Sequence, residues 1–236
     1  MLNRLFVGVI VMAQLMMSND PRPNQTANLR NASAMRTIIL LVSFGMGLLG
    51  CSSAPIHYYT LLEHIPDPPS PLLTPDYQFE MIWVRLPLIV DQPQIVLRQD
   101  QGRLEVLEND RWPMPLSEEL QEALELLLEK NLGTRNLAGV YKDPLQPVLS
   151  IQVDVRLFET RPGSHVLIDA IWSIAYRSAD QPRRTLTCAS RLKQSVSMNL
   201  ENAVLAHQRL IEELAGRIAN KADAWVKDST QKCSVY

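Results

Sequence analysis

The feature that most constrains how this chain can fold is a short apolar run, residues 38–49, which is closed by Gly50 and Cys51. The run follows Arg36 and is about a dozen residues long, whereas a helix needs roughly twenty apolar residues to cross a bilayer. A lasting transmembrane helix is therefore the weaker interpretation. The apolar run has to be set aside before the folded domain is considered.

The order of these residues resembles the signal of a bacterial lipoprotein. In such a signal a basic residue, a short apolar core and a small residue precede a cysteine, whose thiol is acylated, and the peptide is cut just before it. We therefore predict lipidation of Cys51 and removal of residues 35–50 as a signal peptide. The alternative is a buried helix that happens to end in cysteine, which would not require this order.

The first 34 residues do not fit this scheme. They contain a second apolar run, residues 5–17, followed by a polar stretch, residues 18–24, with a composition typical of unstructured chain. Two export signals in tandem make no physical sense, and Met35 stands directly before Arg36. We predict that residues 1–34 are an upstream extension of the reading frame and that residues 51–236 form one folded domain.

The charge balance excludes several classes of partner. The chain carries 23 basic and 25 acidic residues, and four of the basic residues but only one acidic residue precede Cys51. An acidic domain without a basic stripe offers nucleic acid no electrostatic footprint, so no nucleic-acid partner is expected. Anionic lipid head groups find no polybasic patch either. Attachment to a membrane should therefore depend on acyl chains at Cys51.

Hydrophobic periodicity predicts a group of strands before the first helix. β-branched, aromatic and alternating segments mark these strands at residues 56–61, 79–86, 95–98 and 103–107. Gln101 and Gly102 favour a turn that makes the last two a hairpin. The prolines of residues 65–75 cannot join a central sheet, so this segment is predicted to be an extended connector.

Two helices and a meander complete the predicted fold. Leucines at helical spacing from Leu116 predict an amphipathic helix with Ser117 as its cap and Gly133 just past its end. Asn199 is predicted to cap a longer helix near the C-terminus. Alternating segments between the helices predict three antiparallel strands, at residues 149–157, 166–176 and 185–196. The expected architecture is α+β: a single two-layer sandwich in which two helices cover a mixed or antiparallel sheet.

The sequence shows no pattern that would support catalysis. The four histidines lie on different predicted elements without ligand spacing, so no metal site and no cofactor are expected. His207 lies on the apolar stripe of the last helix, where a packed histidine is the common case. The acidic residues of the first helix are expected to be its solvated face: Glu118, Glu119, Glu122, Glu125 and Glu129.

Two pairs of residues remain as candidates for special roles. Cys188 and Cys233 form either a disulfide or two separate thiols, and the sequence does not decide between them. Tyr58 and Tyr59 are neighbours on a predicted strand, so their rings point to opposite faces. We expect one ring to pack inward and the other to be free for a subunit interface, or else to pack beneath the proline-rich connector.

Several short segments of the sequence resemble those of a known protein family. They are His57-Tyr58-Tyr59-Thr60-Leu61, Val84-Arg85-Leu86-Pro87, the segment 91–98, and Arg111-Trp112 before Pro115. Together they resemble the PqiC-type family of ABC-type transport auxiliary lipoproteins, which accompany MCE-domain intermembrane transport systems. The chain departs from the usual pattern at Gln92, where the family often has arginine, and at Pro113, where a small residue is usual.

The resemblance implies a function without catalysis. It implies a lipoprotein in the inner leaflet of the outer membrane that faces the periplasm, binds an MCE-domain protein, forms a homo-oligomer, and tethers a lipid tunnel to support membrane integrity. Ser52, in place of the aspartate of many inner-membrane lipoproteins, agrees with that destination. An alternative is a lipid-binding envelope-assembly lipoprotein that carries cargo in its own apolar pocket. A periplasmic hydrolase is a third and weaker possibility.

Overall fold

The computed structural model describes residues 54–62 and 75–233. The chain divides into two units, residues 1–53 and residues 54–236, and the first lies outside the described residues. The predicted lipidation at Cys51 and the boundaries predicted at residues 34 and 50 therefore also lie outside them. So does most of the proline-rich connector.

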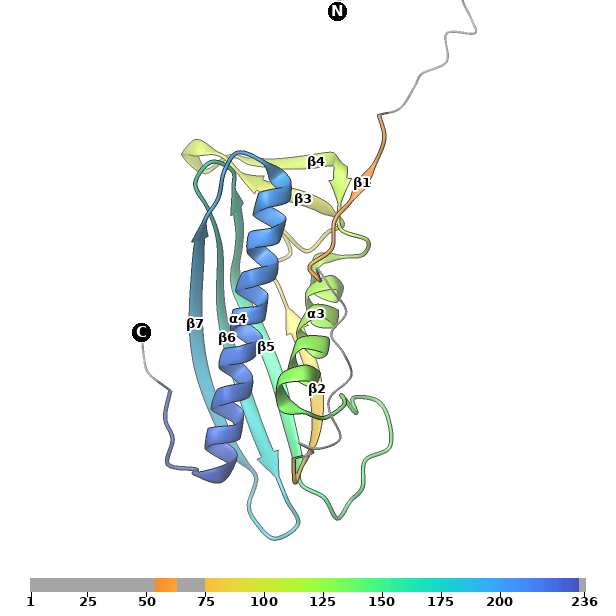
Figure 1. Cartoon of the computed structure of the whole chain (residues 1–236), viewed down its shortest axis with the longest axis vertical. Coiled ribbons are helices and arrows are strands. Elements are labelled where there is room, and N and C mark those ends of the chain that lie inside the picture. The colour runs from red at the N-terminus through yellow and green to blue at the C-terminus, as the bar shows by residue number, and fades with distance from the viewer. Residues whose placement is uncertain (1–53, 63–74, 234–236) are drawn as a thin grey trace, which may run out of the picture. The chain divides into compact units, whose positions relative to one another are not determined.

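The described residues form an α+β domain, as the sequence predicts (Figure 1). Its elements in chain order are β1 (His57–Tyr58), β2 (Gln78–Arg85), β3 (Gln94–Arg98), the 3-10 turn η2 (Asp100–Gly102), β4 (Leu104–Arg111), α3 (Leu116–Leu132), β5 (Val148–Arg161), β6 (His165–Arg177), β7 (Arg184–Ser195) and α4 (Leu200–Lys227).

The larger sheet has the strand order β2-β5-β6-β7. The last three strands form the predicted antiparallel meander, and β2 joins it in parallel to β5. A parallel neighbour requires a crossover connection, which here contains β3, β4 and α3. The sheet is therefore mixed, one of the two possibilities that the sequence leaves open.

The predicted hairpin belongs to a second sheet and not to the main one. It has the order β1-β4-β3, with β3 antiparallel and β1 parallel to β4. Gln101 and Gly102 have positive φ angles of 59° and 79°, which confirms the predicted turn. The single predicted sheet is thus divided in two, because both edges of β4 are occupied by strands of the smaller sheet.

The N-terminus of α3 is capped by a side chain from another part of the chain. Pro115 is at the N-cap and makes no side-chain cap hydrogen bond, so the predicted capping by Ser117 is wrong. Ser117 lies inside the helix, and its backbone N–H donates to Asp91 Oδ1 at 2.9 Å. An aspartate from the β2–β3 loop therefore satisfies a free N–H of the first turn. Gly133 ends the helix in the left-handed conformation, as predicted.

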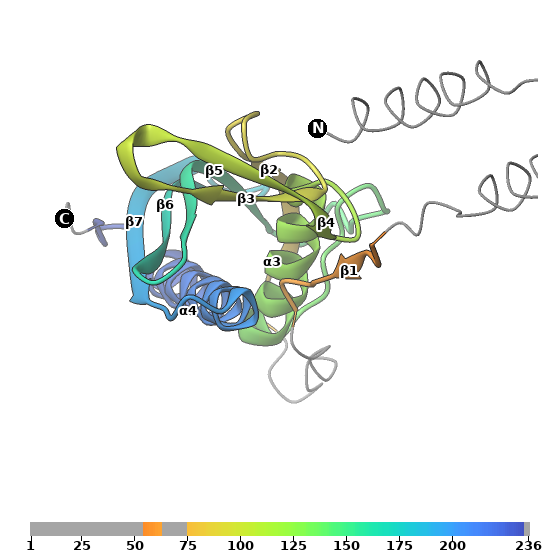
Figure 2. The same cartoon turned by 90° about the horizontal axis from the view of Figure 1, so that it is seen from above.

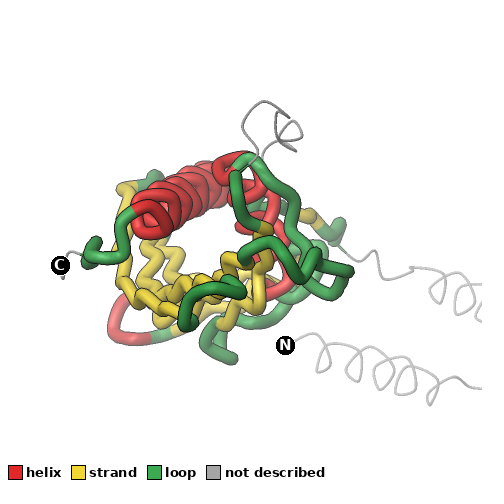
Figure 3. Tube along the Cα trace, turned by 90° about the horizontal axis from the view of Figure 1, so that it is seen from below, coloured by secondary structure: helices red, strands yellow, loops and turns green. Residues whose placement is uncertain are grey.

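The second helix begins as predicted, at Asn199, whose side chain accepts a hydrogen bond from the Asn202 backbone N–H at 3.1 Å. Both helices pack against each other and cover one face of the larger sheet (Figures 2 and 3). The β3–β4 hairpin lies against the other face where β5 ends, with Arg98 paired to Glu159, and the rest of that face stays open. Tyr77 Oη donates to Asp223 Oδ1 at 2.7 Å and so joins the start of β2 to the end of α4. Among the described residues, neither helix is long and apolar enough to span a membrane.

Candidate functional site

The residues that follow the predicted lipid anchor are fixed to the body of the domain. We call residues 57–61 the N-terminal strap. Its last residue, Leu61, is 1% exposed, and its backbone N–H donates to Glu119 Oε1 at 2.8 Å. Thr60 Oγ1 donates to the same carboxylate oxygen at 2.6 Å. One carboxylate of α3 thus receives two hydrogen bonds from the strap.

Glu119 corrects the expectation that the acidic residues of α3 are all solvated. Its exposure is 5%, whereas Glu118 and Glu122 are exposed. A buried carboxylate is costly unless hydrogen bonds satisfy it, and the strap provides those bonds. Helical periodicity places Glu119 at the border of the apolar face but does not show that another segment covers it.

Further contacts fix the strap to α4 and β4. Gln208 Nε2 donates to the Thr60 carbonyl at 2.9 Å, and the Tyr59 N–H donates to the Arg111 carbonyl at 2.8 Å. Asp110 Oδ1 lies 3.2 Å from both Tyr59 Oη and His57 Nδ1. These contacts explain why the predicted strand over residues 56–61 is only two residues long: beyond Tyr59 the backbone turns to side chains of the two helices.

The two tyrosines of the strap point in different directions. Tyr59 is half-buried and packs against the core, whereas Tyr58 is 64% exposed. One ring therefore packs inward and the other faces solvent, as alternation along a strand requires. A role of Tyr58 in an interface stays a prediction.

Cys188 and Cys233 are brought together. The structure pairs Cys188 with Cys233, with their Cα atoms 5.4 Å apart, which is within the range that a disulfide needs. Cys188 is buried on the inner face of β7, opposite Trp172. The pair would fasten the segment after α4 to the sheet. Formation of the bridge in the periplasm stays a prediction.

His207 is a packed core residue and not a ligand or base. It is 1% exposed, its ring stacks on Phe158 with centroids 4.1 Å apart, and its Nε2 lies 2.9 Å from Thr160 Oγ1. Burial lowers its pKa to about 3, so the ring is neutral at neutral pH. Among the described residues, no group of three His, Cys, Asp or Glu side chains is placed to hold a metal ion.

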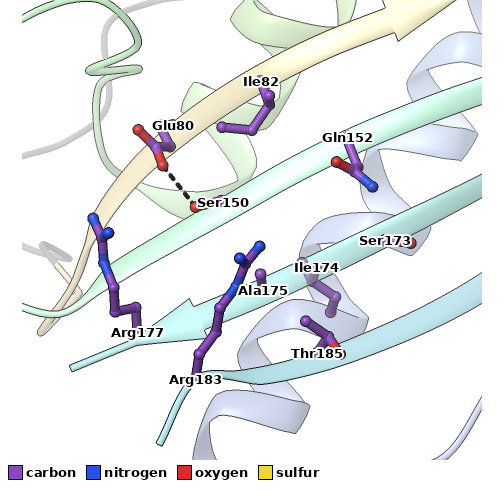
Figure 4. Close-up of a pocket in the computed structure, with 10 residues that line it drawn as sticks. All are labelled: Glu80, Ile82, Ser150, Gln152, Ser173, Ile174, Ala175, Arg177, Arg183 and Thr185. Carbon is purple, nitrogen blue, oxygen red and sulfur yellow. Dashed lines mark hydrogen bonds between the residues drawn. The ribbon is translucent and has the colours of Figure 1, made fainter.

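The open face of the larger sheet carries a polar pocket of about 250 Å³ (Figure 4). It lies where β2 and β5 begin and β6 ends, and Arg183 precedes β7 at its border. The side chains that line it are Glu80, Ile82, Ser150, Gln152, Ser173, Ile174, Ala175, Arg177, Arg183 and Thr185. The predicted alternation along β5 indicates a polar outer face, but only the register of all four strands brings these residues together.

Glu80 is the only carboxylate that lines this pocket. It accepts hydrogen bonds from Ser150 Oγ at 2.7 Å and from Lys142 Nζ at 2.9 Å. Burial opposes ionisation of Glu80, but these two bonds and the charges of Lys142 and Arg177 together hold its pKa below the ordinary value. Glu80 is therefore ionised, and it is already bound by its neighbours.

Comparison with solved structures identifies the fold. A crystal structure of an uncharacterized protein has a TM-score of 0.51 at 18% identity, over 71% of this chain and 98% of the other. A crystal structure of a protein from Xanthomonas campestris has a TM-score of 0.52 at 18% identity, over 74% of this chain and all of the other. Both likenesses are to the fold alone.

The sequence itself identifies the family. Residues 59–219 match the ABC-type transport auxiliary lipoprotein component family, and this range contains every element from β2 to β7, most of α4 and the end of the strap. The chain therefore belongs to this family, as the sequence resemblance predicts. Among curated proteins, no sequence matches the chain significantly.

Proposed function

We propose that the protein is the lipid-anchored periplasmic accessory subunit of an MCE-type ABC intermembrane lipid transport system. In this role it tethers the transport tunnel to the outer membrane through acyl chains on Cys51, and it performs no catalysis. The observation that carries the proposal is the N-terminal strap, which joins the predicted lipidation site to the rigid body of an auxiliary lipoprotein domain.

The geometry of the strap suits a tether. Five residues, 52–56, separate Cys51 from β1. At about 3.5 Å per residue, the six peptide steps from Cys51 to His57 reach at most about 21 Å. Because the strap is then bonded to both helices and to β4, a pull on the lipid anchor acts on the folded core and not on a loose loop. This is what an element that holds a tunnel to a membrane requires.

The alternative, a carrier with its own cargo pocket, has less support. The described space between the helices and the larger sheet is filled by side chains such as those of Leu124, Leu214 and Ile151, each with no exposed surface. The polar pocket of about 250 Å³ on the open face is smaller than the apolar cavities that hold whole small-molecule ligands. A membrane adaptor needs no such cavity.

The exposed ring of Tyr58 is the proposed contact with the MCE protein or with another copy of the chain. Tyrosine is enriched in interfaces because it brings a large apolar area with few rotatable bonds. The Tyr58 ring is mostly exposed, whereas the Tyr59 ring packs against the core, so the Tyr58 ring is the one available for a contact outside the domain. An assembly of several copies would place one such ring on each subunit.

Co-purification tests the proposal. The lipidated protein, extracted in mild detergent, should capture an MCE-domain protein encoded in the same genome. The Tyr58→Ser variant should capture less of it, whereas Tyr141→Ser, a matched change at an 82% exposed tyrosine in the α3–β5 loop, should capture as much as the wild type. Acyl chains bound to the isolated protein without capture of an MCE protein would favour the carrier.

A further inference from the structure

The polar pocket on the open sheet face holds an excess of positive charge. Arg177 and Arg183 line it, and Lys142 reaches its edge through Glu80. Against these three cations stands one carboxylate, that of Glu80. This local surplus of about two charges lies on a chain with a net charge of −2, so it is not part of a generally basic surface.

Among the described residues, neither arginine forms a side-chain hydrogen bond or an ion pair, although the positive charge of Arg177 acts on Glu80. Within the described part of the chain, the ion pairs include neither Arg177 nor Arg183, and Glu80 is already bound by Lys142 and Ser150. Both arginine side chains are exposed. Figure 4 shows both side chains on the same side of the sheet, with Arg177 on the Glu80 side of the pocket and Arg183 beside Ala175. Two guanidinium groups that face one pocket without a partner provide donors for an anion from outside.

The arrangement suits a phosphate group better than a single carboxylate. Arg177 comes from the end of β6, Arg183 from the turn before β7, and the Thr185 hydroxyl from β7 itself. Donors from three directions match a tetrahedral anion that has acceptor oxygens on several sides, and guanidinium forks bind phosphate oxygens in pairs. The volume of about 250 Å³ fits a head group and not a whole lipid.

We infer that Arg177, Arg183 and Thr185 form a binding site for a phosphate group, either free phosphate or the phosphate of a lipid head group. Ile82, which is 47% exposed at the same pocket, supplies an apolar wall beside the charged donors. An amphiphile with an anionic head could rest its first carbons there. The site does not depend on capture of an MCE protein, so the two proposals can fail separately.

The site lies far from the strap within the domain. The pocket lies at the end of the larger sheet where β2 and β5 start, whereas β1 and the strap lie toward the opposite end (Figure 1). At about 3.4 Å per residue, β6 with its 13 residues is about 40 Å long. The phosphate site and the strap are therefore separated by much of the length of the larger sheet.

Isothermal titration of the lipidated protein in non-ionic detergent tests the site. The probes are inorganic phosphate, glycerol 3-phosphate, and short-chain phosphatidylglycerol below its critical micelle concentration. We expect binding that weakens at least about tenfold in Arg177→Ala and in Arg183→Ala, because each loses charge-assisted hydrogen bonds. Arg183→Lys should give an intermediate loss, since it keeps the charge but not the fork.

The matched control is Arg191→Ala, on the same face of β7 but paired with Asp169 at 3.6 Å, which should bind as the wild type does. Because all these arginines are exposed, the melting temperature should stay unchanged. Tighter binding of phosphatidylglycerol than of glycerol 3-phosphate identifies a lipid head group, and equal binding identifies free phosphate. The inference would be overturned if the wild type bound none of the probes or bound a tetraglutamate peptide more tightly. It would also be overturned if a variant with both Arg177→Ala and Arg183→Ala bound them as tightly as the wild type.

Discussion

The carboxylate of Glu119 and the backbone N–H of Leu61 meet at 2.8 Å inside the domain, although 58 residues separate them along the chain. Both residues are buried, so the Leu61 N–H depends on this carboxylate for its hydrogen bond. The bond joins the segment that follows the predicted lipid anchor to the first turn of α3. The strap is therefore part of the fold and not a flexible extension.

Loss of this carboxylate should loosen the strap. Glu119→Ala leaves the Leu61 N–H and the Thr60 hydroxyl without a partner, and we expect the free energy of unfolding to fall by about 1–3 kcal/mol. Urea unfolding measures the change. Glu122→Ala, at an exposed position three residues further along the same helix, is the control and should change it by less than about 0.5 kcal/mol. Equal effects of both substitutions would contradict the role of Glu119.

Substitutions of the two strap tyrosines should have different effects, one on the stability of the domain and the other on its assembly. Tyr59→Ser removes a ring that packs against the core and a hydrogen bond to Asp110, so it should lower the melting temperature. Tyr58→Ser removes a ring that is 64% exposed, so it should leave the melting temperature nearly unchanged and weaken oligomer or MCE capture. Thermal unfolding and co-purification give the two readouts. If both variants only destabilise the fold, Tyr58 has no interface role.

The paired cysteines should stabilise the end of the chain. A disulfide between Cys188 and Cys233 closes a loop with a sequence separation of 45, and we expect Cys233→Ser to lower the free energy of unfolding by about 2–4 kcal/mol. Thiol labelling of the denatured, unreduced protein from the periplasm tests the bridge directly. Full labelling of both residues would show that the two thiols are free.

His207 should make the protein sensitive to acid. Because burial lowers its pKa to about 3, the folded state keeps the ring neutral while the unfolded chain takes up a proton below about pH 6.5. Stability is therefore lost as the pH falls from about 6.5 toward 3, by roughly 3 kcal/mol between pH 6.5 and 4 at 1.36 kcal/mol per pH unit.

The His207→Phe variant isolates this contribution. It keeps an aromatic ring against Phe158 but has no group to protonate, and it leaves Thr160 without its partner. At pH 7 the wild type should be the more stable protein, and the difference should shrink or reverse toward pH 4. Urea unfolding at several pH values measures both curves. Parallel curves would mean that His207 does not cause the acid sensitivity.

Membrane attachment should depend on one residue. Cys51→Ala removes the predicted acylation site, so the variant should leave the membrane fraction, and mass spectrometry of the wild type should show an acylated N-terminal cysteine. Density-gradient fractionation should place the wild type with outer-membrane markers. Unchanged retention of Cys51→Ala would contradict the anchor, and a main peak with inner-membrane markers would contradict the sorting role of Ser52.

Local sequence patterns predict most of the fold but not how its pieces meet. Periodicity places both helices and the meander, and Asn199, Gly133 and the Gln101–Gly102 turn lie where they are predicted. These features depend on neighbours in the chain. The division into two sheets and the parallel position of β2 depend on contacts between distant segments, which no local pattern records.

The same reason explains the residues of the site that the sequence does not reveal. Asp91 caps α3 across 26 residues, and Glu119 binds a strap 59 residues away, so each looks like an ordinary surface acid in the sequence. Arg177 and Arg183 flank the β6–β7 turn, but they share a pocket with Glu80 and Ser150 only through the register of the four strands. The directions of the Tyr58 and Tyr59 rings can be predicted from the sequence, because strand alternation alone requires one ring to point outward.

The hydrogen bond from Gln208 to the Thr60 carbonyl spans 148 residues, and the one from Tyr77 to Asp223 spans 146. Contacts of this range can close only after α4 has left the ribosome, and closing such long loops costs entropy before any contact rewards it. The bonds that join the strap and the start of β2 to α4 therefore form only once α4 has been made. We expect a chain truncated before α4 to lack both of these bonds, and with them the links between the N-terminal part of the domain and its last helix.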